Sequence, residues 1–276
     1  MDVAAALARC GAPDCTAVVS FEQTAGRGRA GRSWESPPGS SLFCTLILRP
    51  AVAPERLSTL PLLAGVAVAE AIEKTTGTPV QLKWPNDLWI GADPERRKAG
   101  GILTTSAIRG QEVDFALVGI GINVAAEADA LPPGATSLHV ATGARIDVAD
   151  LFATILACFD RVYTEPLASG GHPSLDSWRS RAALLGEPVV IEDAGRSHSG
   201  IYAGIDDDGA LLLHDPTSGM RRVVAGDLTR GPQRSRERDA NDLSPPNSET
   251  SCTTSPWQGE RGSRGSRGSR RSGPGR

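Results

Sequence analysis

Arginines and glycines alternate in residues 23–34, which read QTAGRGRAGRSW. A glycine backbone can bend so that its N–H groups approach a ligand closely, and arginine carries a fixed charge in a planar fork that matches carboxylate and phosphate oxygens. Residues 16–21 and 42–48 on either side are mostly β-branched or apolar, which predicts a buried strand at each end of the loop. A solvated basic loop is the ordinary interpretation of such a composition, but a loop held between two core strands favours an anion-binding site.

The KWPND segment at 83–87 places a cation, an indole, a rigid turn, an amide and a carboxylate side by side. Pro85 favours an extended conformation for Trp84, so the segment is predicted to end a strand and open a turn. A capped turn would explain Asn86 and Asp87 alone, but it does not explain Lys83 and Trp84 beside them. The segment is therefore a second candidate for the site.

Two further polar residues stand at the ends of apolar strands. Lys98 comes just before the pair Gly100 and Gly101 that opens one strand, and Asn123 ends the strand predicted over residues 113–122. A single lysine of this kind is ordinarily a surface residue. The side-chain amide of Asn123 is placed where it could face a ligand.

The elements that must position these residues follow from the spacing of apolar residues. That spacing predicts one helix from Pro54 to a stop at Gly77 and a second beginning at Asp147. A hairpin with a loop at 91–98 is expected, and the strands are predicted at 16–21, 42–48, 80–84, 87–90, 99–106 and 113–122. Strands joined by short loops, with helices interspersed, indicate an α+β domain with a mixed, largely antiparallel sheet.

The pattern changes near Leu185, where short strands and turn residues replace the longer elements. Strands predicted at 189–191, 198–205, 210–214 and 221–224 indicate a small β-barrel. Beyond it the chain is rich in arginine, glycine and serine and cannot bury a core. We therefore expect a first domain over residues 1–185, a barrel over 186–230 and a disordered tail over 231–276.

Charge and cysteine content narrow the function classes. The net charge is −3, and because residues 231–276 hold 9 arginines against 5 acidic residues, residues 1–230 keep 20 basic against 27 acidic ones. An acidic body offers no broad surface for nucleic acid, so its arginines are expected to bind a small anion. The five cysteines are scattered without CxxC spacing, although Cys10 and Cys15 could pair, and no apolar run reaches the roughly 18 residues of a membrane helix. A cytoplasmic protein is expected.

Four segments, in this order, resemble the catalytic core of the biotin protein ligases, the biotin–[acetyl-CoA-carboxylase] ligases: QTAGRGRAGRSW at 23–34, KWPNDLW at 83–89, KAGGIL at 98–103 and GIGINV at 119–124. The small barrel, with Gly226, Asp227 and Leu228 at its end, is similar to the SH3-like domain of that family. The resemblance implies a class II synthetase-like catalytic domain. It also implies an ATP-dependent ligase that makes biotinyl-5′-AMP and transfers biotin to a lysine of a biotin carboxyl carrier domain.

The resemblance also implies roles for individual residues. Lys98 and Arg29 would be catalytic, and Asp87 would help to hold Mg²⁺. Biotin would be bound by Gln23, Arg27, Gly28, Arg29, Trp34 and Lys98. ATP would be bound by Arg29, Arg32, Asn86 and Asn123. The loop at 26–34 is expected to be mobile until biotin and ATP bind, because three clustered arginines repel one another.

The chain also departs from the family pattern. Residues 1–9 are predicted to form the helix that follows a Ser/Thr-Thr-Asn biotin-binding segment, so that segment would lie upstream of Met1. The helix-turn-helix of the family's repressors is not expected, so DNA is not an expected partner, whereas a homodimer is compatible with the resemblance. Two alternatives stay open: a lipoate or octanoate protein ligase of the same superfamily, and a truncated, non-catalytic biotin-binding protein.

Overall fold

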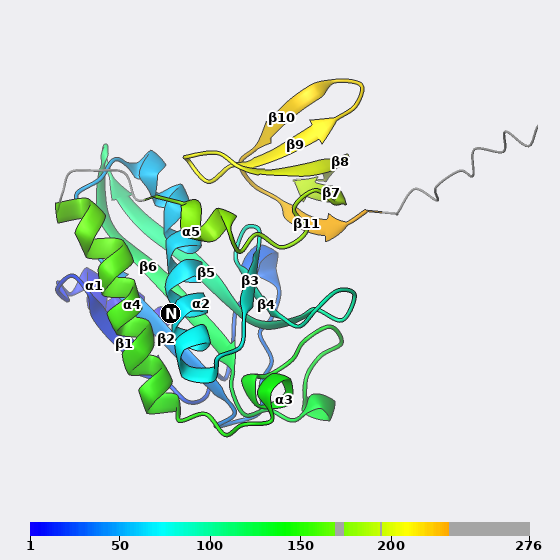
Figure 1. Ribbon diagram of the computed structural model, residues 1–276. Coiled ribbons are helices and arrows are strands. Elements are labelled where there is room, and N and C mark those ends of the chain that lie inside the picture. The colour runs from blue at the N-terminus through cyan, green and yellow to red at the C-terminus, as the bar shows by residue number, and fades with distance from the viewer. Residues whose placement is uncertain (169–173, 194, 232–276) are drawn as a thin grey trace, which may run out of the picture. The chain divides into compact units, whose positions relative to one another are not determined.

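Residues 1–168, 174–193 and 195–231 are described by the computed structural model of the chain (Figure 1). They belong to one compact unit, Met1–Gln233, so the expected boundary at Leu185 between residues 1–185 and 186–230 stays a prediction. Apart from Gly231, the tail expected over 231–276 lies outside the described residues. None of the described helices combines the length and apolarity that crossing a bilayer requires.

Six antiparallel strands form the main sheet, in the order β1-β2-β6-β5-β4-β3. The expectation of an α+β fold with a largely antiparallel sheet is confirmed, because every pairing in this sheet is antiparallel. The strands are β1 (Thr16–Ser20), β2 (Ser41–Leu48), β3 (Val80–Lys83), β4 (Asp87–Ile90), β5 (Arg97–Arg109) and β6 (Glu112–Asn123).

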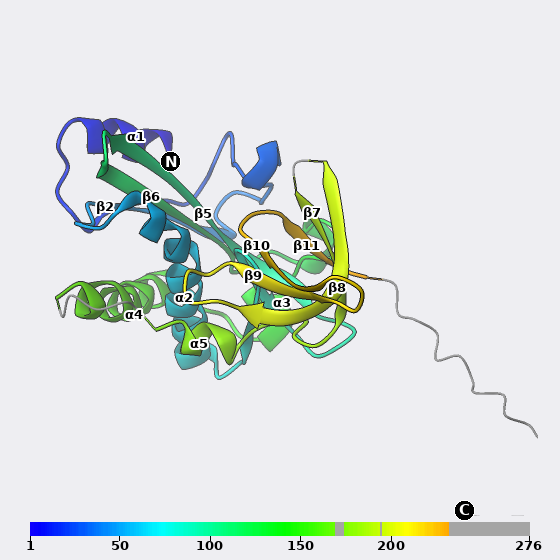
Figure 2. The ribbon, with the colours of Figure 1, turned by 90° about the horizontal axis from the view of Figure 1, so that it is seen from above.

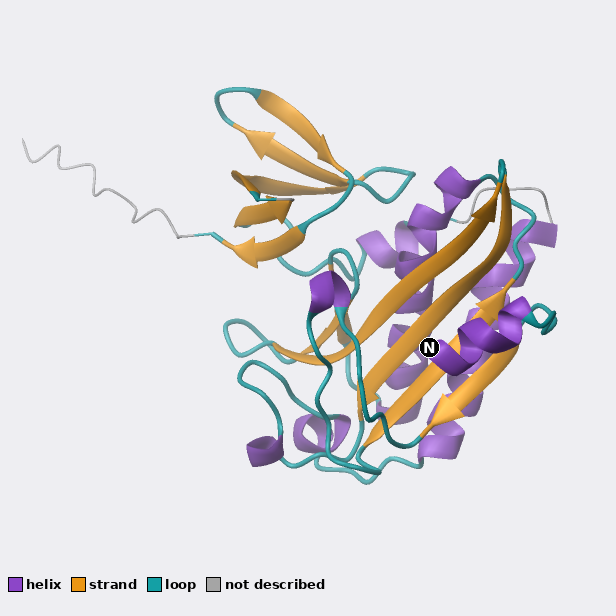
Figure 3. Ribbon diagram, turned by 180° about the vertical axis from the view of Figure 1, so that it is seen from behind, coloured by secondary structure: helices purple, strands orange, loops and turns teal. Residues whose placement is uncertain are grey.

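Helices cover both faces of this sheet. Helices α2 (Leu60–Thr76) and α4 (Val148–Ala168) pack together on one face, and α1 (Asp2–Arg9) lies on the other, as Figures 1 and 3 show from opposite sides. Side chains alternate along β2, so Leu46 faces α2 and α4 whereas Ile47 packs against α1. This double cover explains why all eight residues of β2 are buried.

Two helix boundaries differ from the sequence prediction. The helix expected from Pro54 starts as a 3₁₀ turn, η2 (Pro54–Thr59), and becomes α-helical only at Leu60. Its last residue is Thr76, and the expected stop at Gly77 caps it with a φ of 70°. Asp147 precedes α4 as its N-terminal cap, because its Oδ1 accepts from the backbone N–H groups of Ala149 and Asp150. The short helices were not predicted: η1 (Arg29–Gly31), η3 (Ala128–Ala130), α3 (Leu138–Thr142) and α5 (Asp176–Arg179).

A second, five-stranded antiparallel sheet follows, in the order β10-β9-β8-β7-β11 (Figure 2). The four strands predicted for the small barrel are present, but the barrel does not close, because β10 and β11 remain the two edges of this sheet within the described residues. The strand β11 was not predicted, because the segment 226–230 is short and mostly polar. The strands are β7 (Pro188–Asp193), β8 (Arg196–Ile205), β9 (Leu211–Asp215), β10 (Gly219–Val223) and β11 (Asp227–Arg230).

Trp84 of the KWPND segment joins the two sheets. Its indole Nε1 donates to the carbonyl of Gly209 at 3.0 Å, and its ring is buried. Ser58 of η2 donates to the neighbouring carbonyl of Asp208 at 3.0 Å. The turn between β8 and β9 is thus anchored beside the segments expected to form the site.

Candidate functional site

The loop at 26–34 folds back on itself as a small hairpin. Arg27 and Ser33 form an antiparallel bridge, and the Trp34 N–H donates to the Gly26 carbonyl at 3.0 Å. The 3₁₀ turn Arg29–Gly31 makes the tip. A Cβ at Gly26 would lie 2.3 Å from the carbonyl oxygen of Trp34, so this close approach requires glycine.

The floor of the site is the face of the main sheet on which α1 also lies. Gly101 of β5 and Gly121 of β6 are direct cross-strand partners, and Gly119 lies two residues earlier on the same face of β6. The indole of Trp34 rests on the first two, because a Cβ at either glycine would lie 3.4 Å from its ring atoms. Its Nε1 is buried without a hydrogen-bond partner among the described residues. The floor was not predicted from the sequence, although the alternation of Gly119 and Gly121 with an apolar residue is a signal that could have indicated it.

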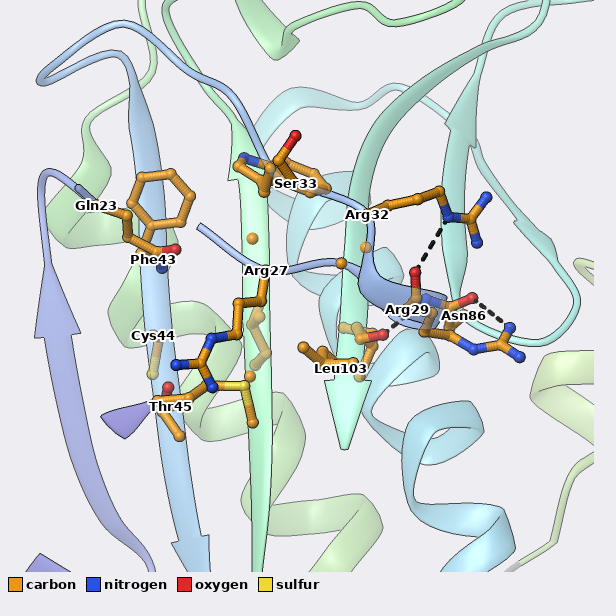
Figure 4. Close-up of a pocket in the computed structure, with 18 of the residues that line it drawn as sticks. Gln23, Arg27, Arg29, Arg32, Ser33, Phe43, Cys44, Thr45, Asn86 and Leu103 are labelled. Carbon is orange, nitrogen blue, oxygen red and sulfur yellow. Dashed lines mark hydrogen bonds between the residues drawn. The ribbon is translucent and has the colours of Figure 1, made fainter. Parts of the chain in front are cut away.

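A pocket opens over this floor and collects nearly all of the predicted site residues (Figure 4). Its wall also includes residues to which the sequence assigned no role, among them Met1, Asp2, Thr45 and Leu103. The predicted residues that line it are Gln23, Arg27, Gly28, Arg29, Arg32, Trp34, Asn86, Asp87 and Lys98.

Arg29 is the most constrained arginine of the loop. Its Nη1 donates to Asn86 Oδ1 at 3.1 Å, a bond drawn in Figure 4, and its Nη2 donates to the Gly226 carbonyl at 3.2 Å. Burial lowers the pKa of Arg29, while the carboxylates of Asp227 and Asp87 act in the opposite direction. Asn86 is itself fixed, because its Nδ2 donates to the Ile102 carbonyl at 2.7 Å.

The other two arginines are more exposed, and each is paired with a carboxylate. Arg27 contacts Asp2 at 2.7 Å, and Arg32 contacts Asp227 at 2.9 Å. No role had been assigned from the sequence to either acidic residue, since Asp2 comes at the start of the chain and Asp227 lies in the second sheet. The electrostatic repulsion expected within the loop is therefore opposed by these pairs. Loop mobility stays a prediction.

Asp87 and two lysines form a cluster beside the loop. Lys98 Nζ lies 2.6 Å from Asp87 Oδ1 and 5.5 Å from the centroid of the Trp34 ring. Lys83 Nζ lies 3.9 Å from Asp87 Oδ2 and 5.1 Å from the Trp89 ring. Burial lowers the pKa of Lys83, and Asp87 opposes that shift. The sequence predicted Lys98 and Asp87 here, but not their direct contact.

The predicted Mg²⁺ role of Asp87 does not fit this cluster as it stands. Mg²⁺ prefers carboxylate and other oxygen ligands, whereas Asp87 faces two ammonium groups. In the part of the chain that the structure describes, no three His, Cys, Asp or Glu side chains gather in one place. The described side chains therefore form no cage that would hold the ion by protein ligands alone.

Asn123, predicted to bind ATP, is not brought to the pocket. Its side chain is 3% exposed, and its Nδ2 donates to the Thr136 carbonyl at 3.0 Å. The amide instead fastens the end of β6 to the segment before α3.

Comparison with known proteins identifies the family of this chain. Residues 12–123 match the Biotin/lipoate A/B protein ligase family, and residues 184–228 match the Biotin protein ligase C terminal domain. The chain is 37% identical over 229 residues to the bifunctional ligase/repressor BirA of Bacillus subtilis strain 168, which covers 82% of this chain and 69% of BirA. This chain belongs to the biotin protein ligase family.

Two further members of the family, one compared by sequence and one by structure, support this assignment. The biotin–[acetyl-CoA-carboxylase] ligase of Paracoccus denitrificans is 35% identical over 221 residues, covering 78% of this chain and 90% of the relative. Among solved structures, the biotin protein ligase of Aquifex aeolicus in complex with biotin and ATP has a TM-score of 0.68 at 28% identity, covering 82% of this chain and 94% of that one. The resemblance stated from the four sequence segments is confirmed.

Proposed function

We propose that this chain is an ATP-dependent ligase that activates biotin as biotinyl-5′-AMP and then transfers biotin to a lysine of a biotin carboxyl carrier domain. The observation that carries the proposal is the convergence of Arg29, Arg32 and Lys98 on one pocket. The name of the Paracoccus relative and the biotin and ATP bound by the Aquifex protein support the same chemistry.

Charge neutralisation is the central task of the first step. A carboxylate oxygen of biotin attacks the α-phosphorus of ATP, and the bond from that phosphorus to the bridging oxygen of the leaving pyrophosphate breaks. Both reactants are anions, so preorganised cations lower their repulsion and stabilise the charge that develops in the transition state. We assign this role to Lys98 and Arg29, which the structure holds in place through Asp87 and Asn86.

The second step needs no nucleophile from the enzyme. The ε-amine of the acceptor lysine attacks the acyl carbon of biotinyl-5′-AMP. The bond from that carbon to the phosphate oxygen then breaks, so AMP leaves with the electron pair and the amine loses a proton. The enzyme positions the two reactants, so neither Ser33 nor Cys44 of the pocket lining is given a covalent role in this chemistry.

The proposal divides the pocket between the two substrates. Biotin would contact Gln23, Arg27, Gly28, Arg29, Trp34 and Lys98, and the nucleotide would contact Arg29, Arg32 and Asn86. Contact with Asn123 would require it to leave its buried position. Mg²⁺ would come bound to the phosphates of ATP, because the described side chains gather no cage of protein ligands for it.

The acceptor we propose is the carrier domain of acetyl-CoA carboxylase or a related carboxylase in the cytoplasm. Some relatives are named repressors as well as ligases. DNA binding is not part of the proposal, because the acidic body of residues 1–230 offers no broad basic surface. A homodimer is compatible with the family, and sedimentation measurements at several protein concentrations would test for it.

Labelled substrates test the function directly. Purified chain, ATP and an apo carrier domain are incubated with labelled biotin, or with labelled lipoate or octanoate, and label on the carrier is measured by mass spectrometry. Transfer of biotin alone is expected. Transfer of lipoate or octanoate alone would favour the lipoate-ligase alternative, and biotin binding without transfer or pyrophosphate release would favour a non-catalytic biotin-binding protein.

A further inference from the structure

A β-bulge brings Lys98 to the site. Between β4 and β5, Leu88 pairs with Gly100 but Trp89 pairs with Lys98, so Ala99 is an extra residue that has no partner on β4. Side chains of a regular strand alternate between faces, and one extra residue moves every preceding side chain to the opposite face. Without the bulge, Lys98 would share the core-facing side of β5 with buried Ile102. With the bulge, Lys98 instead lies on the same side of β5 as Gly101, the side that faces the pocket.

The backbone at the bulge is held from both sides. On one side Lys98 pairs with Trp89 of β4. On the other side the Lys98 N–H donates to the Gly134 carbonyl at 2.9 Å, and the Lys98 carbonyl accepts from the Thr136 N–H at 2.8 Å. The direction in which the Lys98 side chain leaves the strand is therefore fixed, while its four-carbon stem remains able to rotate.

Asp87 restrains the end of that stem. Asp87 pairs with Gly101 in the sheet and so lies on the same face as Lys98. A Cβ at Gly101 would lie 3.4 Å from Lys98 Cε and Nζ, so the stem crosses directly over this glycine. Its ammonium group then meets Asp87 Oδ1 at 2.6 Å. The Asp87 side chain is only 18% exposed, so solvent screens this contact weakly.

We propose that Asp87 is a positioning residue that holds Lys98 against the reacting carboxylate, and that it is not a Mg²⁺ ligand. The inference rests on the proposed function, because it needs biotin as the anion that meets Lys98. Both carboxylate oxygens of Asp87 face ammonium groups, from Lys98 and from Lys83. A Mg²⁺ ion at Asp87 would have to displace Lys98 and would stand beside two positive charges, an unfavourable arrangement for a dication.

The sign of one substitution separates positioning from simple electrostatics. Asp87→Asn removes a negative charge next to an anion-binding pocket, so electrostatics alone predicts tighter biotin binding. If Asp87 acts by orienting Lys98, the same substitution loosens the lysine and weakens biotin binding instead. If Asp87 acted only as a ligand of Mg²⁺, a third result would be expected. Asp87→Asn would then leave biotin binding unchanged in the absence of metal and ATP.

The test measures biotin binding by titration calorimetry in EDTA and without ATP. Wild type, Asp87→Asn, Lys98→Met and the double variant form a double-mutant cycle, and Arg97→Ala removes a neighbouring exposed charge as the matched control. We expect Asp87→Asn to weaken binding about threefold to thirtyfold in the wild-type background and to have no effect once Lys98 is Met. Asp87→Glu is expected to restore part of the affinity, and Arg97→Ala to leave it unchanged.

A second measurement addresses the ion. Biotin-dependent exchange of pyrophosphate into ATP is followed as Mg²⁺ is varied, and the half-saturating Mg²⁺ concentration is expected to be the same for wild type and Asp87→Asn. Unchanged or tighter metal-free biotin binding by Asp87→Asn, or an increased Mg²⁺ requirement, would overturn the inference. Circular dichroism and melting curves establish that each variant is folded. A wild-type chain that binds no biotin in the first titration would instead overturn the proposed function, and the inference with it.

Discussion

Arg32 and Asp227 are 195 residues apart in the sequence, and the Arg32 guanidinium donates a hydrogen bond to the Asp227 carboxylate at 2.9 Å. The same carboxylate lies 3.6 Å from Arg29 Nη1, and the carbonyl of the preceding Gly226 accepts from Arg29 Nη2. One end of β11 therefore orients two arginines of the glycine loop. The second sheet contributes to the site itself.

Asp227→Asn is expected to impair activity more than stability. The Arg32 side chain is 61% exposed, and exposed ion pairs contribute less than about 1 kcal/mol, so the melting temperature should change little. Activity should fall at least about fivefold, because Arg29 and Arg32 lose a shared restraint at the point where charge develops. Biotin-dependent exchange of pyrophosphate into ATP measures the effect.

Glu192→Gln is the matched control for that variant. Glu192 is the exposed cross-strand partner of Asp227 in the second sheet. The substitution Glu192→Gln therefore removes the same charge from a neighbouring position without removing a contact to the loop. Equal effects of the two substitutions would mean that overall charge, and not the contact with the arginines, matters at Asp227.

Lys98→Ala is expected to lower the rate of adenylate formation by about 10²–10³-fold, the usual cost of removing one preorganised electrostatic contact. The fold should be retained, because the Lys98 side chain is 35% exposed. Pyrophosphate release in a single turnover is the measurement, with Arg97→Ala beside it. An unchanged rate would remove Lys98 from the site.

Gly26→Ala is expected to open the hairpin of the loop. Its Cβ would lie 2.3 Å from the Trp34 carbonyl oxygen, which real structures do not tolerate, so the Gly26–Trp34 hydrogen bond should break. Ala30→Gly in the same loop should leave the hairpin intact, because Ala30 already has a φ of 52°, a region that glycine adopts readily. Biotin affinity of the two variants, measured beside wild type, should therefore fall only for Gly26→Ala.

Ligands are expected to protect the loop from trypsin. The side chains of Arg27 and Arg32 are exposed, and ion pairs of exposed side chains contribute little, so cleavage after these arginines should be detectable in the free protein. Biotin together with ATP should suppress it. Equal cleavage rates with and without ligands, at concentrations shown separately to saturate the protein, would argue against closure of the loop.

Truncation after Gly231 is expected to leave the melting temperature and the biotinylation rate unchanged. Residues 232–276 hold few apolar side chains, so their removal should cost little burial. Side-by-side melting curves and transfer assays of the two chains check this. A clear loss of either property in the shorter chain would mean that the tail packs on the rest of the protein.

The main sheet was predictable because burial on both faces leaves a direct mark on a sequence. The continuous apolar run at 42–48 became β2, and the strands on either side of the 91–98 loop paired as expected. A small barrel was predicted, and its strands form one antiparallel sheet that does not close within the described residues, because short alternating strands specify a small sheet but not which of its edges meet. Closure depends on tertiary contacts that no local pattern records.

The site was predictable where a residue type implies its own chemistry. The arginines of the loop, Asn86 and Lys98 do line the pocket. Asp227 was not assigned a role, because nothing near it in the sequence points to a partner so far away. Asn123 was expected to bind the nucleotide, but the sequence could not show that the Thr136 carbonyl would take its amide. The bulge at Ala99 was hidden as well, since two glycines follow it and obscure the alternation of the strand.

The pairing of Gly101 with Gly121 beneath Trp34 has a consequence for inhibitors of this protein. A compound that displaces the indole and lies on these two residues would be recognised by strand backbone, not by side chains. A resistance mutation there can only add atoms, and those atoms would also push away Trp34 and, at Gly101, the Lys98 stem. A substitution at either position that weakens binding of the compound would therefore also lower the activity of the enzyme.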